Sequence, residues 1–236
     1  MMTILHLIPV GLGQADPERW LPQAAREITT HLRYFIAENA KTARAFLKLV
    51  GTTVPLQEIS IETLKPDTTA QEIDGWLKAV PTDQDVGLVS EAGCPAVADP
   101  GALVVARAHV RGLRVLPWTG PSSIMLGLMA SGLQGQRFAF HGYAPVKAHE
   151  RDAQLRSWES ASHKLQQTQI LIETPYRNGA MFEALTATLR ETTRVCIASS
   201  LTCEDESIQT RTVAQWRKAG APAFEKKPTL FLFLAS

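Results

Sequence analysis

The sequence predicts an α/β protein with two α/β domains, a mostly parallel amino-terminal sheet and a mixed carboxyl-terminal sheet. Short apolar segments alternate with amphipathic segments along all 236 residues, and glycine and proline separate them. A chain of this length suits one large domain or two small ones. The segment WTGPSS at 118–123 interrupts the alternation near the middle, so we expect domains at 1–117 and 118–236.

The first half supports a parallel sheet because strands and helices alternate from the start. A parallel sheet binds ligands at the carboxyl ends of its strands, so the loops after these strands are the candidate sites. The pattern predicts strands at Ile4–Ile8, Tyr34–Ala37, Asp85–Val89 and Leu113–Leu116. It predicts helices at Pro22–Thr30, Lys41–Val50, Thr69–Val80 and Pro100–Arg111.

The second half continues the alternation after a helix rich in small residues. We expect strands at Phe138–His141, Gln169–Glu173, Arg194–Ala198 and Thr229–Leu234. We expect helices at Ile124–Leu133, Arg151–Gln166, Arg177–Arg190 and Thr212–Ala219.

The composition excludes several functional classes. Apolar residues make up 45% and charged residues 20%, which argues against disorder and against a fibrous repeat. The 24 Lys and Arg side chains nearly balance the 23 Asp and Glu side chains. The chain therefore lacks the strong positive field with which proteins grip nucleic acid through its phosphates, although a local basic patch is compatible with this balance.

Cysteine and histidine spacing predicts neither a disulfide framework nor a metal site. Cys94, Cys196 and Cys203 are odd in number and form no CxxC pair, which fits a reducing cytoplasm. The six histidines form no HxH or HExxH pair. The first apolar run ends at Pro9 without a basic residue before it, so we expect a strand there and no signal peptide or membrane span.

The loop PVGLG at 9–13 is the first candidate ligand loop. Two glycines after a strand let a ligand approach the backbone, although simple turn glycines explain them too. Asp16 stands where a dinucleotide fingerprint needs a third glycine, which argues against an NAD-dependent oxidoreductase. Glu38 ends the next predicted strand, where an acid can bind a nucleoside ribose.

The loop LVSEAGCPAVADPG at 88–101 supports two interpretations. Asp99 is a good helix N-cap and Pro100 suits a first helical position, so the loop could simply begin a helix. The residues from Ser90 to Ala96 are mostly too small to pack, and they follow a strand that leads to the expected ligand edge. A backbone-lined pocket explains those small residues.

Two further loops follow predicted strands. TGPSS at 119–123 is either a turn with a serine cap or a third ligand loop, and three such loops would converge on one sheet edge. ETPYR at 173–177 is either a helix start capped by Thr174, with a solvated Arg177, or a place where Glu173 accepts a hydrogen bond from a ligand.

The acids at 204–206 are predicted to form a solvated turn. Ser122 and Ser123 lack the GxSxG context of a nucleophile.

Seven segments together resemble the tetrapyrrole methylase superfamily, the class III S-adenosylmethionine-dependent methyltransferases. Within it, they are most similar to the bacterial enzymes that methylate a cytidine ribose 2′-oxygen in small-subunit ribosomal RNA. LVSEAGCPAVADPG resembles the family's LVSDAGTPxISDPG, and HGYAPVK with IETPYRN resembles EGFLPxK with YESPHR. The other segments are HLIPVGLG (6–13), FIAENAKTARAFL (35–47), VLPWTGPSSIMLGLMASGL (115–133) and SLTCEDESIQTRTVAQW (200–216).

The resemblance implies S-adenosylmethionine as cofactor, a cofactor cleft between the two domains, and a homodimer. It also implies that the candidate loops contact the cofactor, with residues 92–94 and Val97 at its methionine and ribose parts and Ser122 and Ser123 near its amino-acid end. The residues that it places at the cofactor are Pro9, Leu12, Ser90, Ala92, Gly93, Cys94, Val97, Ser122, Ser123 and Glu173.

Two departures from the family pattern bear on the substrate. AENAK at 37–41 stands where the ribosomal RNA enzymes have AEDTR, and Arg211 begins RTV where they have RGT. The methyl acceptor therefore stays open between RNA ribose and a tetrapyrrole or another small molecule, and a non-catalytic binding module is a third alternative. Methyl transfer is an in-line displacement that needs no catalytic triad, and Glu38, Glu91 and Asp99 are the candidate bases for a hydroxyl acceptor.

Overall fold

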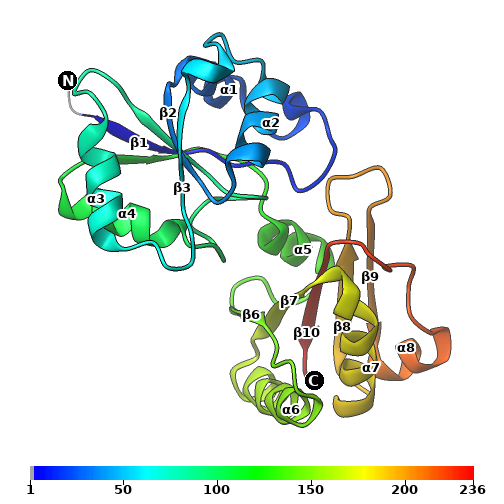
Figure 1. The fold of residues 1–236 in the computed structure, drawn as a ribbon. Helices are drawn as coiled ribbons and strands as arrows, with labels where there is room; N and C mark the ends of the chain where they lie inside the picture. The colour runs from blue at the N-terminus through cyan, green and yellow to red at the C-terminus, as the bar shows by residue number, and fades with distance from the viewer. Residues whose placement is uncertain (1–2) are drawn as a thin grey trace. The chain divides into compact units, whose positions relative to one another are not determined.

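A computed structural model describes residues 3–236, so the first two residues of the predicted amino-terminal domain lie outside the described residues. The chain divides into two compact units, one ending at Ser122 and the other spanning Ser123–Ser236 (Figure 1). Each unit holds one five-stranded sheet covered by helices. The predicted α/β class, with a parallel first sheet and a mixed second sheet, is confirmed.

The sheet of the first unit is parallel throughout and has the strand order β3-β2-β4-β1-β5. The loops after β1, β4 and β5 follow three neighbouring strands, so they leave the sheet at the same edge. The strands are β1 (Ile4–Leu7), β2 (Tyr34–Ala37), β3 (Ser60–Thr63), β4 (Val86–Val89) and β5 (Arg114–Pro117).

Helices cover both faces of this first sheet, as α1 and α2 lie on one face and α3 and α4 on the other (Figure 1). Each face has its own apolar cluster, which is why the central strand β4 is buried along its whole length. Thr69 and Glu72 form a capping box at the start of α3. The helices are α1 (Gln23–His31), α2 (Ala40–Val50), α3 (Ala70–Ala79) and α4 (Gly101–Val110), with 3₁₀ turns η1 (Pro17–Arg19) and η2 (Leu56–Glu58).

The sheet of the second unit is mixed and has the order β6-β7-β10-β8-β9. β7 runs parallel to β6, whereas β10 runs antiparallel to both β7 and β8. The strands β6, β7 and β8 therefore point the same way, and their carboxyl ends share one edge. The strands are β6 (Phe138–Tyr143), β7 (Thr168–Glu173), β8 (Arg194–Ser199), β9 (Ser207–Thr212) and β10 (Thr229–Leu234).

The central strand β10 shows how the second unit buries both sheet faces. Phe231 and Phe233 lie in the apolar cluster under α6, α7 and α8, while Leu230 lies against α5 on the opposite face. A Cβ added to Gly127 of α5 would lie 2.3 Å from Leu230 Cδ2, so glycine permits this close packing. The helices are α5 (Ser123–Ser131), α6 (Ala148–Leu165), α7 (Asn178–Thr188) and α8 (Val213–Ala219), with the 3₁₀ turn η3 (Pro175–Arg177).

Two strands were not predicted, and both lie at the edge of a sheet. β3 and β9 each pair with a single neighbour, and none of their residues is fully buried. Their polar residues gave no apolar signal, because an edge strand packs fewer of its side chains into the core. The structure also begins α6 at Ala148, one turn before the predicted start at Arg151.

Candidate functional site

The loops after β1, β4 and β5 meet at one edge of the first sheet. Val10 and Gly93 form an antiparallel bridge in which each backbone N–H donates to the other's carbonyl oxygen at 2.9 Å. A Cβ added to Gly120 would lie 2.3 Å from Pro9 Cβ, so the third loop packs directly on the first. The predicted convergence of the three small-residue loops is therefore present.

Gly93 lies where the three loops meet. Its φ of +75° is a backbone conformation that side chains oppose. A Cβ there would meet Leu12 Cδ2 at 3.4 Å and Pro121 O at 3.6 Å, so it would project between the first and third loops. The missing side chain leaves space bounded by backbone and by Leu12.

The second and third loops are linked by one cysteine. The Cys94 thiol donates to the carbonyl oxygen of Pro121 over 3.4 Å, and burial raises the pKa of this thiol. Ser90 is almost buried, and its hydroxyl donates to the carbonyl oxygens of Ala92 and Gly93 at 3.2 and 3.3 Å. Small polar side chains thus fix this loop through hydrogen bonds to its own backbone and to the third loop.

The part of the second loop nearest α4 has an unusual backbone. Ala96 and Ala98 adopt φ of +67° and +62°, a region that non-glycine residues rarely occupy. The Asp99 carboxylate supports this shape, because its oxygens accept hydrogen bonds from the Ala96 amide at 2.9 and 3.0 Å and from the Gly101 amide at 2.7 Å. Such strain concentrates at functional sites.

The helix start itself differs from the prediction. α4 is assigned from Gly101, one position later than predicted, with Pro100 before it in a helical conformation. The predicted capping by Asp99 is present, because its carboxylate accepts the Gly101 amide at 2.7 Å. The strained turn directs the Asp99 carboxylate to both Ala96 and Gly101. A Cβ on Gly101 would lie 2.8 Å from Asp99 Oδ1, so this arrangement requires glycine.

The three candidate acids lie together beside this loop. The Glu91 amide donates to Glu38 Oε1 at 3.2 Å, and the Thr42 hydroxyl donates to Glu91 Oε1 at 2.6 Å. Partial burial raises the pKa of Glu38, and the negative charges of Asp99 and Glu91 add to the rise, while the Glu91 amide opposes it. Burial also raises the pKa of Asp99. Glu38 is thus the acid whose proton affinity its neighbours increase.

The AENAK departure has a plain structural role. Asn39 is the N-cap of α2, and its side-chain oxygen accepts a hydrogen bond from the Lys41 amide at 2.9 Å. Aspartate and asparagine cap helices about equally well. The change from the family's acid therefore keeps the helix start and removes one negative charge beside Glu38.

Glu173 and Arg177 form a buried ion pair in the second unit. The Glu173 side chain is 0% exposed, its Oε1 lies 2.8 Å from Arg177 Nη2, and its Oε2 accepts from the Thr174 amide at 2.8 Å. The Arg177 contact is ionic and poorly aligned as a hydrogen bond. Thr174 makes no side-chain cap, and the partly exposed Arg177 pairs with Glu173, so the interpretation of a start capped by Thr174 is wrong. Both oxygens of Glu173 already have partners.

Side chains missed by the sequence analysis complete the edge of the second sheet. The Asn178 amide nitrogen lies within 3.1 Å of the Phe224 and Lys227 carbonyls and the Thr229 hydroxyl. Glu204, Asp205 and Glu206 are exposed in a turn, as predicted, and Asp205 also pairs with Lys227 at 2.9 Å. Only the structure brings these distant residues together, which is why no local pattern indicated them.

The predicted cofactor residues fall into two groups by unit. Ser123 begins α5 and Glu173 ends β7, and both belong to the second unit. The first unit places the others on or beside its three converging loops: Pro9, Leu12, Ser90, Ala92, Gly93, Cys94, Val97 and Ser122. Val97 is about half exposed, with a relative exposure of 49%.

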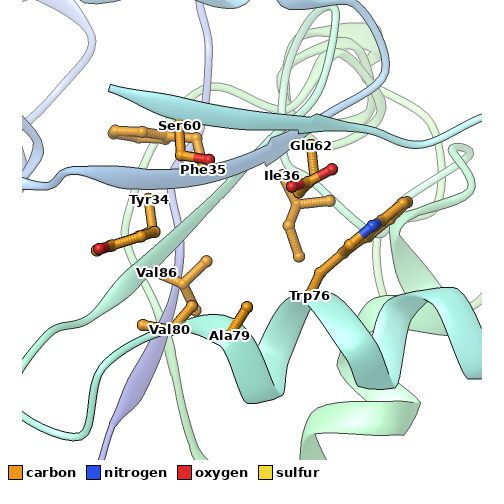
Figure 2. A pocket seen from close by; sticks show the side chains of 9 residues that line it. All are labelled: Tyr34, Phe35, Ile36, Ser60, Glu62, Trp76, Ala79, Val80 and Val86. Atoms are coloured by element: carbon orange, nitrogen blue, oxygen red, sulfur yellow. The ribbon is translucent and has the colours of Figure 1, made fainter. Parts of the chain in front are cut away.

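A separate pocket lies between α3 and the first sheet (Figure 2). Figure 2 shows Ile36 extending from β2 toward α3, with Trp76, Ala79 and Val80 rising from the helix. Its volume of about 50 Å³ suits a few water molecules and is far below that of a cofactor site. The residues that line it are Tyr34, Phe35, Ile36, Ser60, Glu62, Trp76, Ala79, Val80 and Val86.

Within residues 3–236, no group of three or more His, Cys, Asp or Glu side chains is placed to hold a metal ion. In the same part of the chain, every helix is too short or too polar to cross a membrane.

Comparisons with known proteins agree on one family. The family model of tetrapyrrole (corrin/porphyrin) methylases matches residues 5–216. The protein named ribosomal RNA small subunit methyltransferase I from Vibrio cholerae is 34% identical over 214 residues, which cover 90% of this chain and 69% of that protein. Its namesake from Escherichia coli O157:H7 is 29% identical over 86% of this chain and 67% of its own length.

Coverage differs among these relatives. The chain spans 52% of the Xylella fastidiosa protein of the same name and 60% of that from Neisseria meningitidis serogroup B. Among solved structures, the methyltransferase CobJ matches with a TM-score of 0.62 and 12% identity, covering 99% of this chain and 93% of its own. That structural likeness shows the shared fold.

Proposed function

The chain belongs to the tetrapyrrole methylase family, and from this premise we propose that it is an S-adenosylmethionine-dependent methyltransferase that methylates a ribose 2′-oxygen in small-subunit ribosomal RNA. The relatives in Vibrio cholerae and Escherichia coli carry the name of a small-subunit ribosomal RNA methyltransferase. Their similarity extends over most of this chain, which supports the same substrate class.

The convergence of three small-residue loops on one sheet edge carries the cofactor proposal. The Val10–Gly93 bridge and the Gly120–Pro9 contact hold the backbone of all three loops together. A Cβ on Gly93 would occupy the space between Leu12 and Pro121, so this space fits a ligand that approaches the backbone. The edge of a parallel sheet is also where α/β proteins bind nucleotides.

The residues of the three loops would bind and orient the cofactor. When bound, S-adenosylmethionine supplies an activated methyl group on a sulfonium cation. Leu12 and Val97 offer apolar surface for an adenosine, and backbone carbonyls of the loops offer oxygen atoms to a positive charge. Loops fixed by hydrogen bonds limit reorganisation, and positioning alone accounts for a large part of the rate in such displacements.

Glu38 is the residue that we assign as proton acceptor for a ribose hydroxyl. Its Oε1 is engaged by the Glu91 amide, and burial and neighbouring charges raise its pKa. A general base works best when its pKa lies near the working pH, so this rise favours the role. Asp99 is occupied by two loop amides, and Glu91 is exposed and bonded to Thr42.

Calorimetry tests the cofactor, and labelled methyl transfer tests the substrate. We expect binding of S-adenosylmethionine and S-adenosylhomocysteine and no binding of NAD; binding of NAD alone would overturn the proposal. We then expect methyl incorporation into small ribosomal subunits or their RNA from labelled cofactor. Incorporation only into porphyrin precursors would make the acceptor a tetrapyrrole, and firm binding without transfer to any of them would indicate a non-catalytic module.

We further propose that the protein acts as a homodimer in the cytoplasm. Met129 of α5 is 76% exposed and Phe138 of β6 is 39% exposed, which is apolar surface that a second copy could cover. The free cysteines Cys94, Cys196 and Cys203 suit a reducing compartment. Light scattering after size exclusion should give twice the chain mass, and a monomer at micromolar concentration would contradict the dimer.

A further inference from the structure

Three side chains form a line across the first sheet: Asp85, directly before β4, His6 in β1, and Trp118, directly after β5. His6 in β1 is 2% exposed, and its Nε2 lies 3.2 Å from Asp85 Oδ2. The indole Nε1–H of Trp118 donates to His6 Nδ1 at 3.1 Å, and the two rings lie nearly parallel. Asp85 Oδ1 also accepts the Ile4 amide at 2.7 Å, which fixes the carboxylate.

The partners of His6 determine which of its nitrogens carries the proton. An indole N–H can only donate, so Nδ1 must be the unprotonated acceptor. The proton of the neutral ring therefore lies on Nε2 and is donated to the Asp85 carboxylate. His6 is held in one tautomer, with one donor and one acceptor each satisfied.

Trp118 connects these three side chains to the candidate site, because it directly precedes the third loop. Its backbone amide donates to the Leu7 carbonyl at 3.0 Å, and the third loop begins with the next residue. Two residues further, Gly120 packs on Pro9, and Pro121 accepts the Cys94 thiol. An indole fixed at both its ring and its backbone thus sets where the third loop starts.

We infer that His6 is a positioning residue for the cofactor, because its Nδ1 holds the Trp118 indole and thereby the loop 119–122 against the first and second loops. An ordinary core would place an apolar side chain at this buried position of a parallel strand, since a buried polar ring adds stability only when both nitrogens are satisfied. The inference rests on the proposed function, because the loop is assigned to S-adenosylmethionine there.

Two amide substitutions, each of which replaces one of the two ring nitrogens of His6, separate a positioning role from simple filling of the core. In His6→Asn the side-chain oxygen can take the place of Nδ1 and accept from Trp118. In His6→Gln the amide takes the place of Nε2 and can donate to Asp85, but the indole loses its acceptor. Trp118→Phe removes the donor from the other side.

The experiment measures S-adenosylhomocysteine affinity by calorimetry and amide hydrogen exchange of residues 116–122, with thermal unfolding to confirm that each variant folds. We expect His6→Gln and Trp118→Phe each to weaken binding about fivefold to tenfold and to speed exchange in this segment, and the double variant to be no worse than either. In His6→Asn, both the affinity for S-adenosylhomocysteine and the amide exchange of residues 116–122 should stay near those of the unaltered protein.

The outcomes separate this inference from the proposed function. Equal defects in His6→Asn and His6→Gln, or additive defects in the double variant, would overturn the positioning role. Absence of binding by the unaltered protein would overturn the cofactor assignment instead. Hydrogen exchange still decides in that case whether His6 holds the loop.

Discussion

The two sheets build their carboxyl-terminal edges in different ways. In the first unit, backbone bridges and small residues join the loops, as in the pairing of Val10 with Gly93 and the packing of Gly120 on Pro9. In the second unit, charged and amide side chains such as Arg177 and Asn178 join them. The first edge joins its loops through backbone and small residues, whereas the second uses polar side chains to bind its own loops.

The difference follows from the topology of each sheet. Three adjacent parallel strands bring the loops after β1, β4 and β5 side by side, so their backbones can touch directly. In the second sheet, β10 runs in the opposite direction between β7 and β8 and separates the loops that follow them. The Asn178 side chain, which follows β7, instead binds the segment 224–229 that leads into β10.

The largest effect on stability is expected from breaking the ion pair of the second edge. Arg177→Ala leaves the fully buried Glu173 carboxylate without its counter-ion, and we expect a loss of about 3–5 kcal/mol in the free energy of unfolding. Glu173→Ala should cost less, because the Arg177 side chain is 27% exposed and can be hydrated. Urea unfolding measures both, and an equal or smaller loss for Arg177→Ala would contradict this account of the edge.

The next effect tests whether the first edge carries the chemistry. Glu38→Gln keeps an oxygen to accept from the Glu91 amide but cannot take a proton. We expect methyl transfer to slow about 100-fold while the dissociation constant of S-adenosylhomocysteine stays the same. An unchanged kcat would remove Glu38 as the base, and Glu91→Gln serves as the matched control because its carboxylate is exposed.

A smaller effect is expected from adding a methyl group where the first and third loops are in contact. In Gly120→Ala the added Cβ would lie 2.3 Å from Pro9 Cβ, so the third loop must shift. We expect a loss of about 1–3 kcal/mol in stability together with weaker cofactor binding. Calorimetry and urea unfolding on the same variant test this, and unchanged affinity would show that the position of the third loop does not matter for the ligand.

The acids of the first edge also predict how stability changes with pH. The pKa of Glu38 is raised above its ordinary value of 4.5, so the folded state holds this proton more tightly than the unfolded state. Its contribution to stability is therefore greatest at low pH and falls as the pH rises from about 4.5 through the raised value. The free energy of unfolding, measured by urea denaturation across this pH range, should fall less steeply with pH for Glu38→Gln than for the unaltered protein. Parallel curves for the two proteins would contradict the raised pKa.

The sequence indicated the buried parts of this molecule better than its edges. Central strands such as β4 and β10 are apolar along their length, so the apolar pattern placed them within one residue of their bounds. β3 and β9 are polar edge strands, whose formation depends on a neighbour that local pattern does not reveal. The small residues of the three loops predicted the first edge, because that edge is made of backbone.

The second edge could not be predicted in the same way. Glu173 was identified from its place at a strand end, but its pairing with Arg177 depends on the shape of the 3₁₀ turn between them. Asn178 contacts residues about 50 positions away, and nothing near it in the sequence indicates those partners. The His6 line was missed for the same reason, since 112 positions separate His6 from Trp118.

The smallest effect should come from a glycine that belongs to neither edge. Gly75 lies exposed within α3, and a Cβ there would have nothing within 4 Å. Gly75→Ala should therefore raise the free energy of unfolding by about 0.5–1 kcal/mol, because alanine loses less backbone freedom in a helix. Cofactor affinity should stay constant, since the added Cβ contacts nothing and Gly75 lies in α3, outside the loops that hold Gly93 and Gly120. If Gly75→Ala weakened binding as much as Gly120→Ala, the effect of the latter would reflect a general response of the unit and not the contact with Pro9.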